Sequence, residues 1–140
     1  MEQLLKIPYN VFNDWALLQQ FLERRGNPRY ELVGDVDLYY RKDIFNLGNL
    51  VRVDGGLDLF ESLIQSLGNL VRVDSYLNLF NAPNQSLGNL EYVGGSLDLR
   101  YTRIQSLRNL EYIGDILYLS KYHQIPEEQL TKFKDQIEYY

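Results

Sequence analysis

The sequence predicts a repeat solenoid: a stack of about five short parallel strands with an α-helical cap at each end. Two observations predict this fold. The phrase LGNLVRV occurs at 47–53 and again at 67–73, and a pair of leucines separated by one residue recurs with the same period of twenty. A fixed period of this length is typical of solenoids, in which each unit buries its apolar side against its neighbours.

Five units of twenty residues can be aligned, and they account for most of the chain: 27–46, 47–66, 67–86, 87–106 and 107–126. The two ends fall outside this frame. We therefore expect one repeat domain over 1–140, with an N-terminal cap at 1–26, five repeats at 27–126 and a C-terminal helical cap at 127–140.

Within a unit, the pair Leu97 and Leu99 has the period of a strand, so both leucines point to one face and the residue between them points to the other. The preceding Leu-x-x-Leu-x-x-Val segment has the wider spacing of a tight helical turn or irregular coil. Paired glycines before the strand, such as Gly94 and Gly95, favour a corner with close backbone approach. Stacked units then share a continuous core, and their strands form a parallel ladder.

Two units depart from this frame. In the first, Val36-Asp37-Leu38 comes one residue early, and Ile44 regains the register. In the third, the segment 81–84 (NAPN) replaces the apolar column, and Asn84 is a poor core residue. Proline lacks an amide donor, so we expect a bulge there.

The first cap is predicted to be a helix that begins at Asn13 or Asp14 and ends near Gly26, with an apolar stripe formed by Trp15, Leu18, Phe21 and Leu22. The second is predicted to begin at Pro126, with Glu127 and Glu128 near its N-terminus and a stripe formed by Leu130, Phe133 and Ile137. Each helix would cover the apolar end of the stack.

The composition excludes several classes of function. The chain has 140 residues, 45% of them apolar, no cysteine and a formal net charge of −5. This acidic balance argues against binding to nucleic acid or anionic lipid. No apolar run is long enough to cross a membrane, and no secretory signal is visible. We therefore expect a cytoplasmic protein, in the host cytoplasm if it is viral.

No group of residues has the pattern of an active site. His123 is the single histidine, and the recurring serines Ser66, Ser86 and Ser106 suit the start of a turn rather than nucleophilic attack. No glycine-rich phosphate loop or metal-ligand spacing is present. We expect no enzymatic activity, catalytic residue, metal or cofactor.

The exposed side of the strand ladder carries the candidate binding residues. The residues between the paired leucines are Asp37, Asp58, Asn78, Asp98 and Tyr118, and the residues after the second leucine begin with Tyr39, Phe60, Phe80 and Arg100. Tyr40, Tyr76 and Tyr101 lie nearby in the sequence. Aromatic side chains are typical anchors of protein interfaces. Strand propensity alone is the alternative explanation for the aromatic column.

The acidic column also has two interpretations. A charged strand face keeps a protein in solution, but carboxylates about 4.8 Å apart repel one another and gain affinity for a proton, a cation or a basic partner. The column keeps its side chains parallel, and Asn78 interrupts the charge. We therefore do not expect a calcium site.

The segment 97–110 (LDLRYTRIQSLRNL) resembles the L-x-L-x-x-N-x-L-x-x-L pattern of leucine-rich repeats, at the twenty-residue length of bacterial members. The resemblance covers 27–126 and suggests a bacterial or bacteriophage source. It implies that the strand face is the ligand surface. The positions of the family's ladder asparagine hold Ser62, Ala82, Thr102 and Tyr122, so an alternative spine is expected from Asn49, Asn69, Asn89 and Asn109.

The sequence therefore predicts a non-enzymatic module that binds a protein through its strand face. The partner is expected to be a protein with a basic surface, and self-association is also allowed. Two alternatives stay open: an effector that inhibits a host defence protein by means of its acidic face, and a structural component of a particle or assembly.

Overall fold

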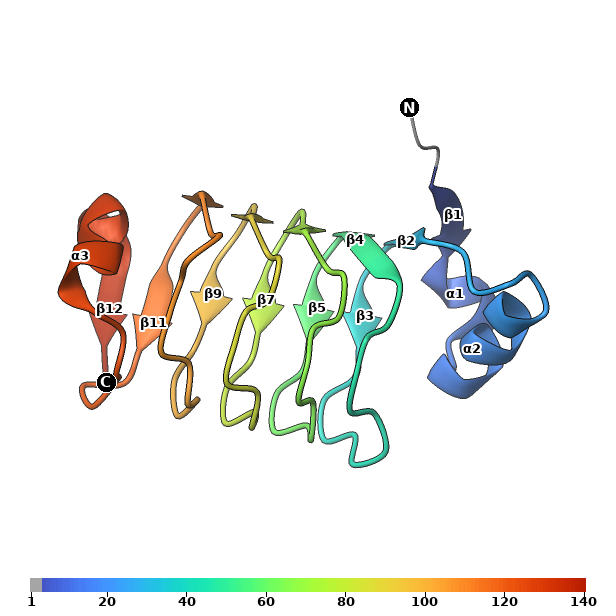
Figure 1. Ribbon diagram of the computed structural model, residues 1–140, viewed down its shortest axis with the longest axis horizontal. Coiled ribbons are helices and arrows are strands. Elements are labelled where there is room, and N and C mark those ends of the chain that lie inside the picture. Colours follow the sequence, from blue (N-terminus) through green and yellow to red (C-terminus); the bar gives the residue numbers. More distant parts are fainter. Residues whose placement is uncertain (1–3) are drawn as a thin grey trace.

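The computed structural model describes residues 4–140 as a β-solenoid with two parallel sheets of six strands each (Figure 1). Each of the five predicted units contributes one strand to each sheet. In the view of Figure 1 the turns stack side by side from the N-terminal cap on the right to the C-terminal cap on the left. The predicted solenoid, with its ladder of short parallel strands, is confirmed.

The two sheets are built from short strands in chain order. Sheet A consists of β1 (Leu5–Pro8), β2 (Tyr30–Val33), β4 (Leu50–Asp54), β6 (Arg72–Val73), β8 (Tyr92–Val93) and β10 (Tyr112–Ile113). Sheet B consists of β3 (Val36–Asp37), β5 (Leu57–Asp58), β7 (Leu77–Asn78), β9 (Leu97–Asp98), β11 (Leu117–Leu119) and β12 (Ile137–Tyr139).

The repeat places identical residue types in register along each sheet. In sheet B, Leu57 pairs with Leu77 and Leu77 with Leu97, and all three are buried. In sheet A, Val53 pairs with Val73 in the same manner. The predicted ladder of leucine pairs is sheet B; the Leu-x-x-Leu-x-x-Val segment ends in a second strand, which was not predicted and which builds sheet A. In the last three units that strand carries a single inward apolar residue, such as Val73 or Val93, so it lacks the leucine pair that marks sheet B.

The corner between the two sheets requires glycine in some turns. A Cβ atom on Gly94 would overlap the carbonyl oxygen of Asp74 in the preceding turn. Gly55 has a φ of +147°, and a Cβ there would lie 2.5 Å from the carbonyl oxygen of Gly34. The close backbone approach predicted from the glycine pairs is confirmed, and it lets successive turns stack at strand spacing.

The N-terminal cap agrees with the prediction and adds two elements. Helix α2 (Trp15–Glu23) begins after Asp14, whose side chain accepts a hydrogen bond from the Leu17 N–H at 3.0 Å. Its buried residues are Trp15, Leu18 and Leu22, and Phe21 packs against the core. A short helix α1 (Tyr9–Phe12) precedes it, and β1 extends sheet A by pairing with β2.

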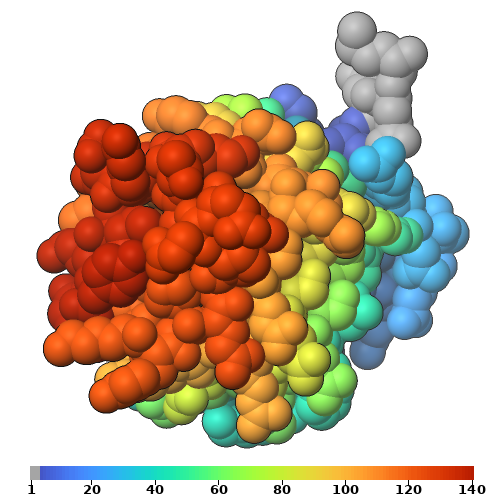
Figure 2. Space-filling model, turned by 60° about the vertical axis from the view of Figure 1, so that its left-hand side comes forward, coloured from blue at the N-terminus to red at the C-terminus, as the bar shows by residue number. Residues whose placement is uncertain are grey.

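The C-terminal cap is less helical than predicted. Helix α3 covers only Glu127–Leu130, a 3-10 helix continues over Thr131–Gln136, and β12 then adds a strand to sheet B beside β11. Leu130 and Phe133 are buried, as the stripe predicted, but Ile137 lies in the strand. The cap covers the end of the stack in Figure 2, where it is drawn in red.

The expected bulge at Pro83 does not form. Asn81 has the same left-handed φ as Glu61 and Tyr101, and the Ala82 N–H donates to Leu79 as in the neighbouring turns. Asn84 takes the place of the apolar residue and is fully buried. Pro83 is exposed and needs no amide partner, so the turn keeps its shape.

No helix within residues 4–140 is long and apolar enough to cross a membrane.

Candidate protein-binding surface

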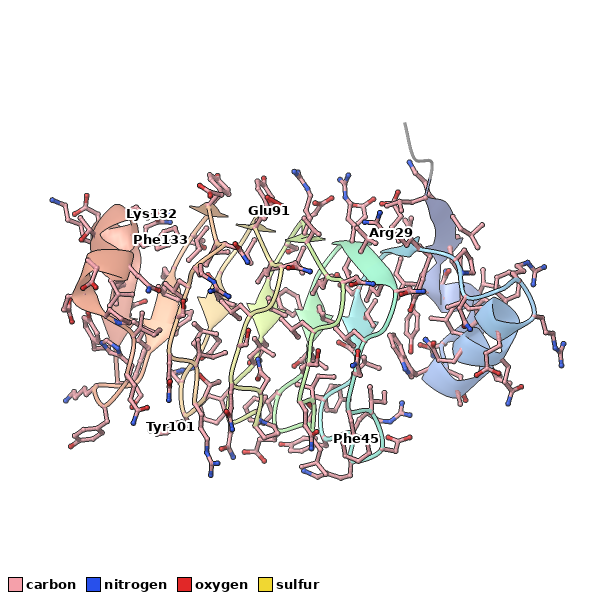
Figure 3. The ribbon with its side chains drawn as sticks, in the orientation of Figure 1. Arg29, Phe45, Glu91, Tyr101, Lys132 and Phe133 are labelled. Carbon is pink, nitrogen blue, oxygen red and sulfur yellow. The ribbon has the colours of Figure 1, made fainter. Side chains whose placement is uncertain are left out.

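Five aromatic side chains form an unbroken series of ring contacts where sheet B ends and the next turn begins. We call this series the aromatic row: Tyr39, Tyr40, Phe60, Phe80 and Tyr101. The rings of Phe60 and Phe80 stack with their centroids 4.9 Å apart, and the other three contacts are edge-to-face at 5.2 to 5.6 Å. Figure 3 places Tyr101 at this turn, below sheet B.

The members of the aromatic row differ in exposure. Tyr39, Tyr40 and Tyr101 are 51%, 54% and 58% exposed, whereas Phe60 and Phe80 are half-buried. The two phenylalanines are thus less exposed than the tyrosines of the predicted column, because each ring is covered by its neighbours in the stack. The outer tyrosines offer the accessible surface.

The turn after sheet B forces a left-handed backbone at one position in each of the first four repeats. Tyr40, Glu61, Asn81 and Tyr101 occupy this position, with φ between +49° and +60°. A residue with a side chain pays about 1–2 kcal/mol for this conformation, and asparagine tolerates it better than most. Tyr40 and Tyr101 therefore hold a backbone conformation that asparagine, as at Asn81, adopts with less strain.

The acidic column of sheet B has a structural task. The Oδ1 atoms of Asp58, Asn78 and Asp98 each accept a hydrogen bond at 3.0 Å from the N–H two residues later. Asparagine can replace aspartate in this bond, which explains why Asn78 fits the column. Aspartate and asparagine commonly form such local turns, so this signal was available in the sequence.

Arg100 closes the C-terminal half of the surface. Its Nε and Nη2 atoms donate to the two carboxylate oxygens of Asp98, at 3.0 and 2.7 Å. Its guanidinium carbon lies 5.1 Å from the Phe80 ring centre, 5.0 Å from that of Tyr118 and 4.5 Å from that of Tyr140. The predicted residue Tyr118 is thus joined to the others through Arg100, and Tyr140 was not predicted.

The N-terminal half carries uncompensated carboxylates. Burial raises the pKa of Asp58, opposed by its bond from the Phe60 N–H, and the charge of Asp37 raises it further. The pKa of Tyr76 is also raised, first by burial and then by the charges of Asp37, Asp35 and Asp58. Tyr76 therefore stands in the field of three carboxylates. All the predicted site residues lie in the strands of sheet B or within three residues of them.

A second exposed column, on sheet A, was not predicted. Arg52 and Arg72 both bind the carboxylate of Asp74 at 2.6 Å. The Arg72 guanidinium lies 3.8 Å above the Tyr92 ring, and Tyr92 stacks on Tyr112 at 4.7 Å. Arg52, Arg72, Tyr92 and Tyr112 lie in register along sheet A. Their alignment was not predicted, because the second strand of each unit was not predicted.

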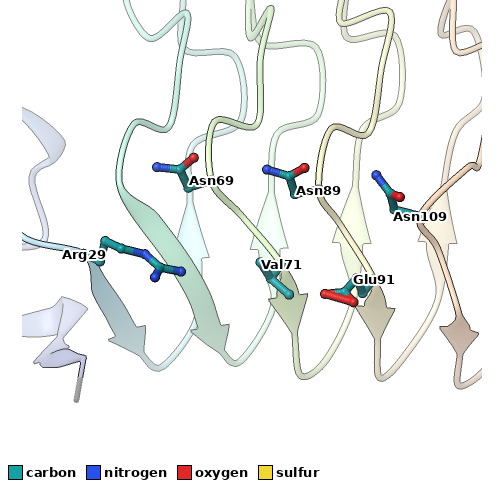
Figure 4. Close-up of a pocket in the computed structure, with 6 residues that line it drawn as sticks. All are labelled: Arg29, Asn69, Val71, Asn89, Glu91 and Asn109. Atoms are coloured by element: carbon teal, nitrogen blue, oxygen red, sulfur yellow. The ribbon is translucent and has the colours of Figure 1, made fainter. Parts of the chain in front are cut away.

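The alternative asparagine spine forms only in part, and on the surface. Asn49 donates to the Asn27 carbonyl at 2.6 Å, Asn69 donates to Asn49 at 3.0 Å, and Asn109 donates to the Gly88 carbonyl at 2.9 Å. Asn69, Asn89 and Asn109 line a shallow pocket of about 410 Å³ together with Arg29, Val71 and Glu91 (Figure 4). The amides are exposed or half-exposed, so they are not a buried ladder.

The remaining candidates for chemistry are structural in their contacts. The Nδ1 atom of His123 accepts a hydrogen bond from the Ile125 N–H at 3.1 Å, and its ring stacks on Tyr139. Ser66 and Ser86 accept bonds from the N–H groups of Gly68 and Gly88. Within residues 4–140, no group of three or more His, Cys, Asp or Glu residues is arranged to hold a metal ion.

Comparisons with protein-family models, with curated proteins and with solved structures gave no match to this chain.

Proposed function

We propose that this solenoid is a non-enzymatic module that binds a protein through the aromatic row and the adjoining face of sheet B. One observation carries the proposal: Tyr40 and Tyr101, both more than half exposed, occupy positions with a left-handed backbone. Residues held in an unfavourable conformation concentrate at functional sites, where a benefit other than stability retains them.

The orientation of the rings favours a protein over a sugar or a nucleobase. Sugars and bases bind aromatic residues by lying flat on an open ring face. Phe60 and Phe80 face each other with an interplanar angle of 18°, and Tyr40 and Tyr101 contact them with their ring planes nearly perpendicular. The two phenylalanines therefore cover one another, and the accessible aromatic surface belongs to the tyrosines, whose rings and hydroxyl groups suit the mixed contacts of a protein interface.

The test uses variants that remove rings without disturbing the fold. The double variant Tyr40→Asn/Tyr101→Asn places at both turns the residue that position 81 already carries in the same conformation. Its free energy of unfolding in urea is expected to fall by no more than about 0.5 kcal/mol, because relief of the left-handed strain offsets the lost ring contacts. Phe60→Ala and Phe80→Ala are less informative, because their loss also removes stacking.

The immobilised protein is used to capture partners from the lysate of its native source. Wild type and a control variant, Phe45→Gln, are expected to capture the same protein, whereas the double tyrosine variant loses it. Phe45 is 47% exposed and lies outside the aromatic row, and glutamine occupies its column at position 65. Undiminished capture by a folded double variant would contradict the proposal.

A further inference from the structure

We infer that the partner presents a basic segment, and that its lysine or arginine side chains dock over the N-terminal half of sheet B, beside Asp37, Asp58 and Tyr40. This inference rests on the proposed function and adds the chemistry of the partner and its position along the stack. It follows from a difference in charge between the two halves of the binding surface.

The N-terminal half combines open carboxylates with open aromatic surface. Asp35 and Asp37 are exposed, and Asp58 is half-buried between Asp37 and Asn78 in the register of the sheet. No salt bridge within residues 4–140 involves these three carboxylates. Asp58 uses one oxygen for the Phe60 N–H, and its second oxygen has no partner in the described chain.

The cations nearest in sequence are directed elsewhere. Arg41 binds both carboxylate oxygens of Asp43 at 2.8 Å, and Lys42 donates to the backbone carbonyl of Glu61 at 2.8 Å. Neither contributes an ion pair to Asp37 or Asp58. The negative field on this half of sheet B is therefore available to a partner, and Tyr76 lies within it.

The C-terminal half has the opposite character. The carboxylate of Asp98 is neutralised by the two hydrogen bonds from Arg100, whose guanidinium also lies against three rings. A basic side chain placed there would meet a cation instead of a free carboxylate. Charge thus changes along one continuous row of rings, which places a bound basic segment on the N-terminal half.

A cation beside the aromatic row would gain from both features. Lysine and arginine bind favourably to carboxylates and to aromatic rings. Both kinds of group are present here, because the carboxylates belong to the same repeat as Tyr40 or to the next one. A neutral or acidic segment would meet the same rings but would leave the carboxylates unpaired. The charge complementarity therefore favours a basic partner.

The test is a titration of the ¹⁵N-labelled protein with hexalysine, followed by amide chemical shifts. We expect saturable shifts at Asp37, Asp58 and Phe60, with little change at Tyr101. The shifts should weaken as the NaCl concentration rises from about 0.05 M to about 0.3 M, because screening reduces exposed charge interactions. Hexaglutamate should cause no shifts on this face.

Two matched variants separate a defined site from general attraction to an acidic protein. Asp37→Asn/Asp58→Asn should lower the affinity for hexalysine about fivefold to tenfold, as two partly exposed ion pairs predict. Glu91→Gln/Glu111→Gln removes the same charge from the side of sheet A and should leave the affinity unchanged. Equal losses in both variants, or shifts centred on Glu91, would overturn the inference.

The two proposals fail separately. The titration needs no native partner, and the capture experiment with the tyrosine variants needs no charge change. If capture depends on Tyr40 and Tyr101 but hexalysine does not localise on sheet B, the protein-binding function stands and the basic partner is wrong.

Discussion

At the scale of single residues, Asn84 is the clearest departure from the repeat. It is fully buried in the column of Ile64 and Ile104, its Nδ2 donates to the Ser86 carbonyl at 3.1 Å, and its Oδ1 meets no donor in the described chain. A buried polar atom without a partner costs about 1–3 kcal/mol. The turn retains its shape around this residue, so the cost is local.

We expect Asn84→Ile to raise the free energy of unfolding by about 1–2 kcal/mol, because it removes the unpaired oxygen and restores the apolar column. Urea denaturation measures the change, with Gln85→Ile, at an exposed neighbouring position, as the control. A loss of stability in Asn84→Ile would show that the hydrogen bond to Ser86 matters more than the unpaired oxygen.

The charge of Asp58 gives a prediction about how the stability of the fold changes with pH. Its folded-state pKa is raised, first by burial, so the protonated carboxyl stabilises the fold below the unfolded pKa, and this contribution is lost as pH rises through the folded pKa. Asp58→Asn keeps the hydrogen bond, as Asn78 does at the same 3.0 Å, and removes the charge.

Asp58→Asn should therefore be more stable than wild type at pH 7, and the difference should shrink as pH falls toward about 3, below the ordinary pKa of aspartate. Urea denaturation at several pH values tests this expectation. Asp98→Asn is the comparison, and it should lose stability at pH 7 because it breaks the ion pair with Arg100. The same outcome for both variants would contradict the assignment of charge on sheet B.

At the scale of elements, the C-terminal cap satisfies the backbone of the last full turn with side chains. The Gln136 amide donates to the carbonyls of Ile113 and Asp115 at 2.6 and 2.7 Å, and the Lys132 ammonium donates to the Leu110 carbonyl at 2.9 Å. Gln129 accepts the Leu107 N–H at 2.7 Å. The edge of sheet A is thereby closed by side chains, while β12 continues sheet B.

Gln136→Leu should lower the free energy of unfolding by about 1–3 kcal/mol, because it leaves two carbonyls without their donor. Gln124→Leu, at an exposed position in the preceding turn, should have little effect. Thermal and urea denaturation compare the two variants. Equal stability of Gln136→Leu and wild type would mean that water replaces the amide at no cost.

At the scale of the whole molecule, the caps are expected to keep the solenoid monomeric. Removing 127–140 would expose the edge of β11 and the apolar side chains of Leu117, Leu119 and Ile125, all of which are buried. Open sheet edges with apolar ends pair with other chains. We expect the truncated chain to dimerise or aggregate, which light scattering would detect. A truncated chain that stayed monomeric and stable would show that 127–140 is not needed as a cap.

Much of the architecture could be predicted from the sequence, because the repeat fixes which residues lie in register. The leucine pairs gave sheet B, and Asp14 marked the start of α2. Sheet A was missed because strands such as β8 carry one inward apolar residue, so no leucine pair marks them as it marks the equally short strands of sheet B. The strand β12 was missed because Ile137 also fits a helical stripe, and only pairing with β11 decides between the two.

The candidate surface was predicted in its residues but not in its contacts. Tyr39, Phe60 and Phe80 could be placed in one column by the period alone. The period does not reveal that a left-handed turn brings Tyr40 and Tyr101 into the same row, or that Arg100 binds Asp98. Those contacts depend on the turn conformation, which the sequence pattern of leucines does not determine.

The near-identity of neighbouring turns bears on how such a chain can change over generations. Strands β4 and β6 pair Arg52 with Arg72 and Val53 with Val73, so the joint between two units brings together the same residue types on both sides. A gene duplication that inserted one more unit would meet compatible neighbours in both directions. The number of rings offered to a partner could thus grow or shrink in steps of one turn, about 4.8 Å, while the core kept the same joints.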